Sequence, residues 1–94
     1  EQGMILSIEP GYYAENRYGI RIENLVEVVS AAPGMLTFSP LTLVPYDRCL
    51  ITPKLLDTSE INWLNAYHER VRETLSPLLS VKEKQELEKL CTRI

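Results

Sequence analysis

The chain changes character near its middle, and this change constrains its fold more than any other feature. Residues 1–46 contain short runs of β-branched and aromatic residues separated by Pro and Gly, whereas residues 57–94 carry apolar residues at helical spacing. Strands that precede helices, rather than alternating with them, predict the α+β class. We therefore divide the chain into a strand-forming part, residues 1–46, and a helical part, residues 47–94.

The first part is predicted to form antiparallel strands. Residues 4–9 form one strand that ends at Pro10 and Gly11, a strong turn signal, and residues 19–29 form a second, uninterrupted strand. The connection between them, residues 12–18, is short enough for a hairpin-like antiparallel pair. The remaining expected elements are a turn and two short strands, at residues 31–34, 35–38 and 41–44.

The second part is predicted to be a helical hairpin. Asp57 with Glu60 three residues later has the pattern of a capping box, and Ser80 with Glu83 repeats it. The first helix is expected over residues 59–76, where Pro77 ends it. Its apolar residues fall within about a third of the helix circumference, the pattern of a packed core; they are Ile61, Leu64, Tyr67, Val71 and Leu75. In the second helix one face holds Leu87, Leu90 and Ile94.

Two glutamates in the strand-forming part are candidates for a functional site. Glu9 ends the first predicted strand and Glu23 lies inside the second, so antiparallel pairing can bring both to one face. A carboxylate within an apolar strand is costly to bury alone, and either a metal ion or Arg21, which shares a face with Glu23, would offset that cost. Periodicity alone leaves the question open and favours solvated glutamates on an exposed sheet face.

The wider context of these glutamates resembles a known enzyme family. The runs GMILSIEPGYY, at residues 3–13, and YGIRIENLVEV, at residues 18–28, resemble the end of the catalytic domain of aminopeptidase P enzymes. These are pita-bread metallopeptidases, alongside prolidase and methionine aminopeptidase. The runs PLTLVPYDRCLI, at residues 40–51, and WLNAYHERVRETL, at residues 63–75, resemble the C-terminal extension of the longer, cytosolic-type aminopeptidases P. The resemblance covers nearly the whole chain, and prolidase-like relatives share its first half.

The resemblance implies a dinuclear metal site. The family uses two Asp, one His and two Glu as ligands, and its E-P-G and R-I-E-N motifs match Glu9, as a ligand of one metal, and Glu23, as a bridge between both. Arg21 and Tyr13 match positions that support the site and help to handle substrate. The metal implied is manganese. The other ligands have no counterpart here, since the only histidine, His68, is expected to be a packed structural residue of the first helix. We therefore expect the chain to be a fragment that binds metal weakly and is inactive by itself.

By resemblance, the whole protein is expected to be a cytoplasmic, homodimeric Xaa-Pro aminopeptidase that acts on peptides with proline second, with the helical part in the dimer interface. The alternatives are a prolidase, which cleaves Xaa-Pro dipeptides, and a non-catalytic pita-bread binding or dimerisation module. A net charge of −3 argues against a nucleic-acid partner, and no apolar run reaches the roughly 20 residues needed to span a membrane. Cys49 and Cys91 are expected to be free thiols of a reducing compartment.

Overall fold

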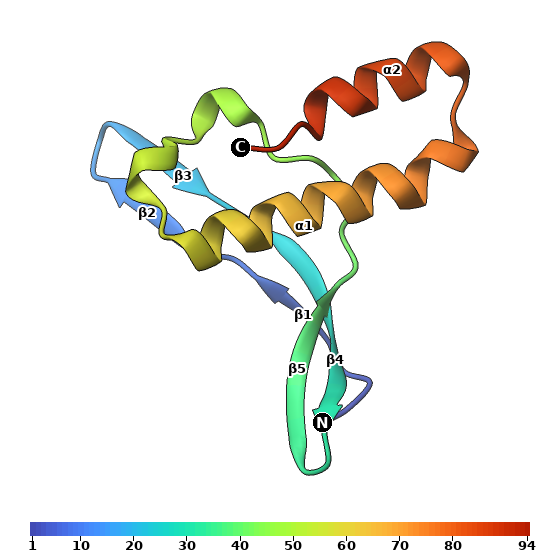
Figure 1. Ribbon diagram of the computed structural model, residues 1–94. Helices are drawn as coiled ribbons and strands as arrows, with labels where there is room; N and C mark the ends of the chain where they lie inside the picture. Colours follow the sequence, from blue (N-terminus) through green and yellow to red (C-terminus); the bar gives the residue numbers. More distant parts are fainter. The chain divides into compact units, whose positions relative to one another are not determined.

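The structure, a computed structural model, describes residues 1–94 and contains five strands followed by two α-helices (Figure 1). This order confirms the predicted α+β class. The chain divides into two compact units, Glu1–Thr42 and Leu43–Ile94. All strands lie in the first unit and both helices in the second.

The strands of the first unit form two antiparallel sheets. β1 (Ile5–Ile8) pairs with β4 (Asn24–Ala32), which also pairs with β5 (Met35–Pro40). β2 (Gly11–Ala14) and β3 (Tyr18–Arg21) form a separate two-stranded ribbon. The antiparallel pairing predicted for the first two strands is therefore confirmed, and so are the turn and the third strand that follow.

The prediction of one uninterrupted strand over residues 19–29 is wrong. That run is divided between β3 and β4, so that Glu23 lies in the break between two strands and not inside one. Pro10 accounts for the break, because it faces Ile22 and has no N–H to donate. Only the hydrogen bond from the Ile22 N–H to the Pro10 carbonyl, at 3.0 Å, crosses this point.

Two further expectations are also wrong. Residues 12–18 are not a simple connection, because they contain most of β2 and the start of β3. The chain reverses at Asn16, whose φ of 57° lies in the left-handed region that Asn tolerates better than most residues. Residues 41–44 form no strand. Pro40 and Pro45 bracket this segment and cannot donate ladder hydrogen bonds.

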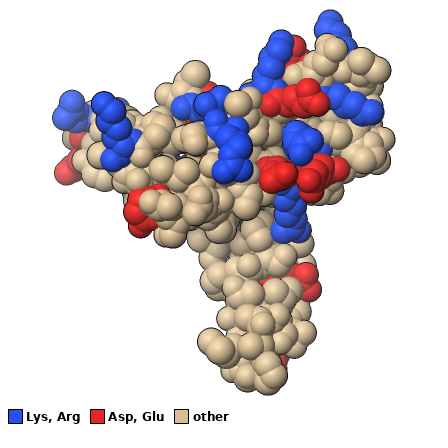
Figure 2. Space-filling model, viewed as in Figure 1, with Lys and Arg blue, Asp and Glu red and all other residues tan.

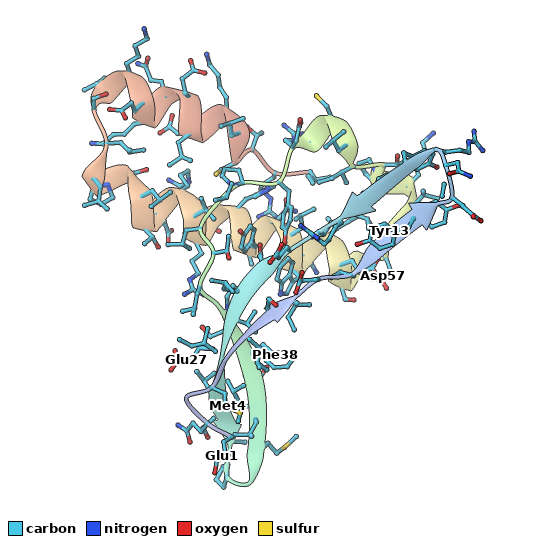
Figure 3. All side chains as sticks on the ribbon, turned by 180° about the vertical axis from the view of Figure 1, so that it is seen from behind. Glu1, Met4, Tyr13, Glu27, Phe38 and Asp57 are labelled. Carbon is cyan, nitrogen blue, oxygen red and sulfur yellow. The ribbon has the colours of Figure 1, made fainter.

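The two faces of the three-stranded sheet differ in polarity. Since side chains alternate along a strand, even-numbered positions of β1 and β4 share one face. That face is apolar and includes Met4, Leu6, Ile8, Val26, Val28 and, from β5, Phe38. Figure 3 shows Glu27 and Phe38 on opposite sides of the sheet. Few charged side chains cover this region in Figure 2, whereas both signs of charge cover the helices.

The second unit is built on α1 (Thr58–Leu75) and α2 (Val81–Leu90). Short 3₁₀ turns precede and connect them, at Arg48–Leu50, Pro53–Leu55 and Ser76–Leu78. Neither α-helix combines the length and the hydrophobicity that crossing a membrane requires.

Both predicted capping boxes are present. Asp57 accepts a hydrogen bond from the Glu60 N–H at 2.8 Å, and the Glu60 carboxylate accepts one from the Asp57 N–H at 2.8 Å. Ser80 and Glu83 make the same reciprocal pair at the start of α2. The two helices therefore begin where the sequence predicts, because side chains satisfy N–H groups that the first helical turn leaves free.

The core of the second unit forms around the predicted stripe of α1. Val71 is fully buried, and it clusters with Tyr67, Leu87 and Cys91. The Tyr67 hydroxyl donates a hydrogen bond to the Val44 carbonyl at 2.8 Å. The core interpretation of the stripe is confirmed, and both cysteines are free thiols, Cys49 exposed and Cys91 buried.

Candidate metal-binding site

The β1–β4 and β2–β3 ladders share one register. The pairs on either side of the break are Ile8 with Asn24 and Gly11 with Arg21. Extending this register pairs Glu9 with Glu23, and the hydrogen bond from Ile22 to Pro10 maintains the register across the break. The structure therefore places the two candidate glutamates opposite each other.

The pair type brings these two side chains close. In an antiparallel ladder, hydrogen-bonded and non-hydrogen-bonded pairs alternate. Because Ile22 and Pro10 form a hydrogen-bonded position, Glu9 and Glu23 occupy a non-hydrogen-bonded one, where side chains on the same face approach most closely. Two like charges in this arrangement destabilise a ladder, and a cation between them would reverse the sign of that effect.

Each glutamate contacts the residue two positions before it. The Ser7 hydroxyl donates a hydrogen bond to Glu9 Oε2 at 2.7 Å, and Arg21 Nε lies 3.5 Å from Glu23 Oε2. A spacing of two residues places both members of each pair on the same face of the strand. The ion pair expected between Arg21 and Glu23 is present, whereas the role of Ser7 had no signal in the sequence beyond this spacing.

Tyr13 lies against the backbone of two glycines on the β2–β3 ribbon, where Figure 3 labels it. A Cβ atom added to Gly19, its ladder partner, would stand 2.8 Å from Tyr13 Cδ1, and one added to Gly11 would stand 2.7 Å from the Tyr13 hydroxyl oxygen. Any residue other than glycine would displace the ring. Since Gly11 is the nearer of the two to Glu9 along the ribbon, the hydroxyl end of Tyr13 points towards the paired carboxylates.

The carboxylate pair fits part of a divalent metal site. Oxygen donors of this kind suit cations such as Mn²⁺ and Mg²⁺. Both Glu9 and Glu23 are exposed within this chain, and no group of three or more His, Cys, Asp or Glu side chains is placed to hold a metal. The pair can therefore supply two ligands.

His68 belongs to the second unit and not to this site. Its side chain is fully buried, and its Nε2 atom accepts a hydrogen bond from the Tyr46 N–H at 3.0 Å. Burial lowers the pKa of His68 below its usual value, and the positive charge of Arg48 lowers it further. The structural role predicted for this histidine is confirmed.

Comparison with known proteins identifies the family. A family model described as the C-terminal region of peptidase M24 matches residues 34–94, and another, described as metallopeptidase family M24, matches residues 1–30. The chain belongs to the peptidase M24 family. The metallopeptidase match contains Glu9, Tyr13, Arg21 and Glu23, so the paired carboxylates lie in its part of the chain.

Several relatives align with most of the chain. Xaa-Pro aminopeptidase app-1 of Caenorhabditis elegans is 53% identical over 72 residues, which make up 71% of this chain and 12% of that protein. Xaa-Pro aminopeptidase 2 of Sus scrofa is 46% identical over 82 residues, or 83% of this chain and 12% of that protein. Protein pid-5 of Caenorhabditis elegans is 41% identical over 91 residues, or 92% of this chain and 9% of that protein. The chain thus spans about a tenth of the length of these relatives.

A solved structure matches the whole chain. It is a crystal structure of X-prolyl aminopeptidase from Caenorhabditis elegans, described as a cytosolic enzyme with a di-nuclear active site. The TM-score is 0.85 and the sequence identity 41%, and the match covers 100% of this chain and 17% of that structure. The chain therefore has the fold of one part of a pita-bread aminopeptidase, as the sequence resemblance predicted.

Proposed function

We propose that the whole protein is an Xaa-Pro aminopeptidase, which hydrolyses the bond between the first residue of a peptide and a proline that follows it. In this proposal residues 1–46 supply the end of the catalytic domain and residues 47–94 form a C-terminal extension. The observation that carries the proposal is the pairing of Glu9 with Glu23 on one face, in a segment that matches the M24 metallopeptidases. The aminopeptidase names of the relatives add further support.

Glu9 and Glu23 are the proposed metal ligands. In this proposal Glu9 would hold one of two divalent ions and Glu23 would hold both, with manganese as the metal. Two opposed carboxylates supply hard oxygen donors, and a bound cation removes the repulsion between them. A chain that provides two ligands and no third binds metal weakly, so we expect residues 1–94 alone to hydrolyse nothing.

Arg21 and Tyr13 are the proposed supporting residues. Arg21 fixes the orientation of the Glu23 carboxylate through its ion pair, and such partners raise both the precision and the affinity of a metal site. The Tyr13 hydroxyl donates a hydrogen bond to bound substrate. Two metal ions held there would supply an activated water and a Lewis acid for the scissile carbonyl.

We further propose that the protein is a cytoplasmic homodimer whose interface includes the helical extension. Trp63 on α1 remains 51% exposed and Leu90 on α2 53% exposed, which leaves apolar surface outside the core of the second unit. The solved relative is described as a cytosolic enzyme. Sedimentation of the intact protein as a monomer at micromolar concentration would contradict the dimer.

Two other functions are less well supported. A prolidase would share the first half of the chain, but two of the three relatives reported above are named as aminopeptidases and align over both halves. A non-catalytic homologue would not need both carboxylates, and both are present with their supporting contacts.

The test is peptide hydrolysis by the intact protein supplied with Mn²⁺. We expect release of the first residue from the tripeptide Arg-Pro-Pro, whereas a prolidase would cleave only the dipeptide Arg-Pro. Replacing Glu23 or Glu9 by Gln should abolish this release and lower the bound metal measured by elemental analysis.

The matched control is Glu15→Gln. Glu15 lies in the turn between β2 and β3, so its substitution removes one carboxylate from the same hairpin without touching the pair. Turnover and metal content should remain unchanged in this variant. If Glu23→Gln retained both as well, the proposed site would be wrong.

A further inference from the structure

We propose that Ser7 is a positioning residue for the metal ligand Glu9, an inference that rests on the proposed function. The Ser7 hydroxyl, on β1, donates a hydrogen bond at 2.7 Å to Oε2 of Glu9, which follows the end of that strand two residues later. A bond of this length between a hydroxyl and a carboxylate is in the short range typical of charge-assisted hydrogen bonds.

The hydrogen bond from Ser7 to Glu9 matches the ion pair between Arg21 and Glu23 on the facing segment, because each contact orients one carboxylate of the pair. Glu23 is held by Arg21 and Glu9 by Ser7, in both cases by the side chain two residues earlier. The two donors differ in charge, so the site gains one positive charge and not two. Because the carboxylate pair attracts cations through its own negative charge, a neutral donor orients Glu9 without opposing the binding of metal.

The hydrogen bond also determines which oxygen remains available. Oε2 receives the Ser7 hydroxyl, and the structure shows no other hydrogen bond to the Glu9 side chain. Oε1 is therefore left for a cation. An exposed glutamate has several rotatable bonds that metal binding would otherwise have to order, and a hydrogen bond made beforehand reduces that entropic cost.

The experiment compares two variants of nearly equal shape in the intact protein. Ser7→Thr keeps the hydroxyl, whereas Ser7→Val replaces it with a methyl group, and both side chains are β-branched and suit a strand. The metal-free protein is titrated with Mn²⁺ by calorimetry. We expect Ser7→Thr to bind like the unsubstituted protein and Ser7→Val to bind about 10–100-fold more weakly, the usual effect of losing a partner that orients a ligand.

Thr37→Val is the matched control. Thr37 lies on β5, on the sheet face that carries Ser7, and is exposed. Thr37→Val therefore removes a comparable hydroxyl group at a position away from Glu9. Its Mn²⁺ affinity should not change. Thermal unfolding of each variant verifies that it is folded, and Ser7→Ala provides a second hydroxyl-free variant if Ser7→Val does not fold.

The outcomes separate this inference from the proposed function. Equal Mn²⁺ affinity of Ser7→Thr and Ser7→Val, together with loss of affinity in Glu9→Gln, would overturn the role of Ser7 and leave the metal site intact. Unchanged Mn²⁺ binding in Glu9→Gln, or no Mn²⁺ binding by the unsubstituted protein, would overturn the site itself and the inference with it.

Discussion

The buried imidazole of His68 should make the second unit sensitive to mild acid. Its Nε2 atom accepts a hydrogen bond from the Tyr46 N–H, so Nε2 carries no proton and the neutral ring has its proton on Nδ1. Nδ1 is buried and has no hydrogen-bond partner. Protonating Nε2 would make it a hydrogen-bond donor that faces another donor, the Tyr46 N–H. It would also place a positive charge in a fully buried position.

Two substitutions of similar size separate the hydrogen bond from the charge. His68→Gln keeps an acceptor for the Tyr46 N–H and does not titrate, and the Nδ1 proton that it removes has no partner to lose. His68→Met removes the acceptor. A backbone N–H left without its partner away from water costs about 1–3 kcal/mol, so at pH 7.5 the Gln variant should be the more stable of the two by about that amount.

The sign of the pH effect follows from the lowered pKa. The unfolded chain binds a proton at His68 near the ordinary pKa of 6.5, whereas the folded chain does so only at lower pH. The stabilisation is therefore complete above about pH 6.5 and is lost as the pH falls towards the pKa of the folded state. Because a single proton is involved, this effect can change the free energy of unfolding by at most about 1.4 kcal/mol per pH unit.

The assay is urea unfolding between pH 5 and pH 8, followed by Trp63 fluorescence. Trp63 is the only tryptophan and stacks on Tyr67, with ring centroids 5.3 Å apart, one residue from His68. At each pH the free energy of unfolding of the Gln variant is subtracted from that of the unsubstituted protein. This difference cancels the titration of the carboxylates that both proteins share. Parallel stability curves for these two proteins below pH 6.5, or equal stability of the Met and Gln variants, would refute the reasoning.

Three further predictions concern packing, the site and a helix end. Val71→Ala should lower the free energy of unfolding by about 2 kcal/mol, because two buried methyl groups are lost and a cavity remains; a loss below about 0.5 kcal/mol in urea unfolding would contradict this. Gly19→Ala should reduce the peptide hydrolysis proposed for the intact protein as Tyr13→Phe does, because its methyl group displaces the Tyr13 ring. It should add nothing in the Tyr13→Phe background, and additive losses would mean that Gly19 acts in another way. Ser80→Ala should cost about 1 kcal/mol and speed hydrogen exchange of the first amides of α2, and unchanged exchange there would show that the cap contributes nothing.

Local patterns were sufficient to predict where the helices begin, whereas the second helix ends at Leu90, so the prediction that Ile94 lies on its face is wrong. Asp57 and Ser80 each precede a Glu by three residues, and this spacing alone locates both helix starts. The stripe around Val71 identifies the buried face of α1 for the same reason, since 3.6-residue periodicity is a property of the sequence itself. Asn65 gave no such signal. It is buried and accepts a hydrogen bond from the Ile94 N–H at 2.8 Å, a contact made possible only by how the chain end folds back.

The strands were less predictable because their limits depend on pairing. The residues around Glu23 have the β-branched character of one continuous strand, and nothing in that run reveals the break. Its cause lies on the facing strand, where Pro10 has no N–H. The same holds for the site. Alternation placed Arg21 beside Glu23, but only the register of the ladders shows that Glu9 faces Glu23 directly.

The continuous register makes the hairpin unequally tolerant of insertions and deletions. Extra residues beside Asn16 lie beyond the last ladder pair and leave the strands unchanged. A single residue added to β2 alone, unless a bulge absorbs it, moves the β2 residues that follow it to the opposite face of the ribbon. Between Gly11 and Tyr13 such an insertion would turn Tyr13 away from the face of the paired carboxylates, and a second residue added opposite it in β3 would restore the pairing beyond it. Natural or engineered changes of length in this hairpin should therefore occur at its tip or in compensating pairs.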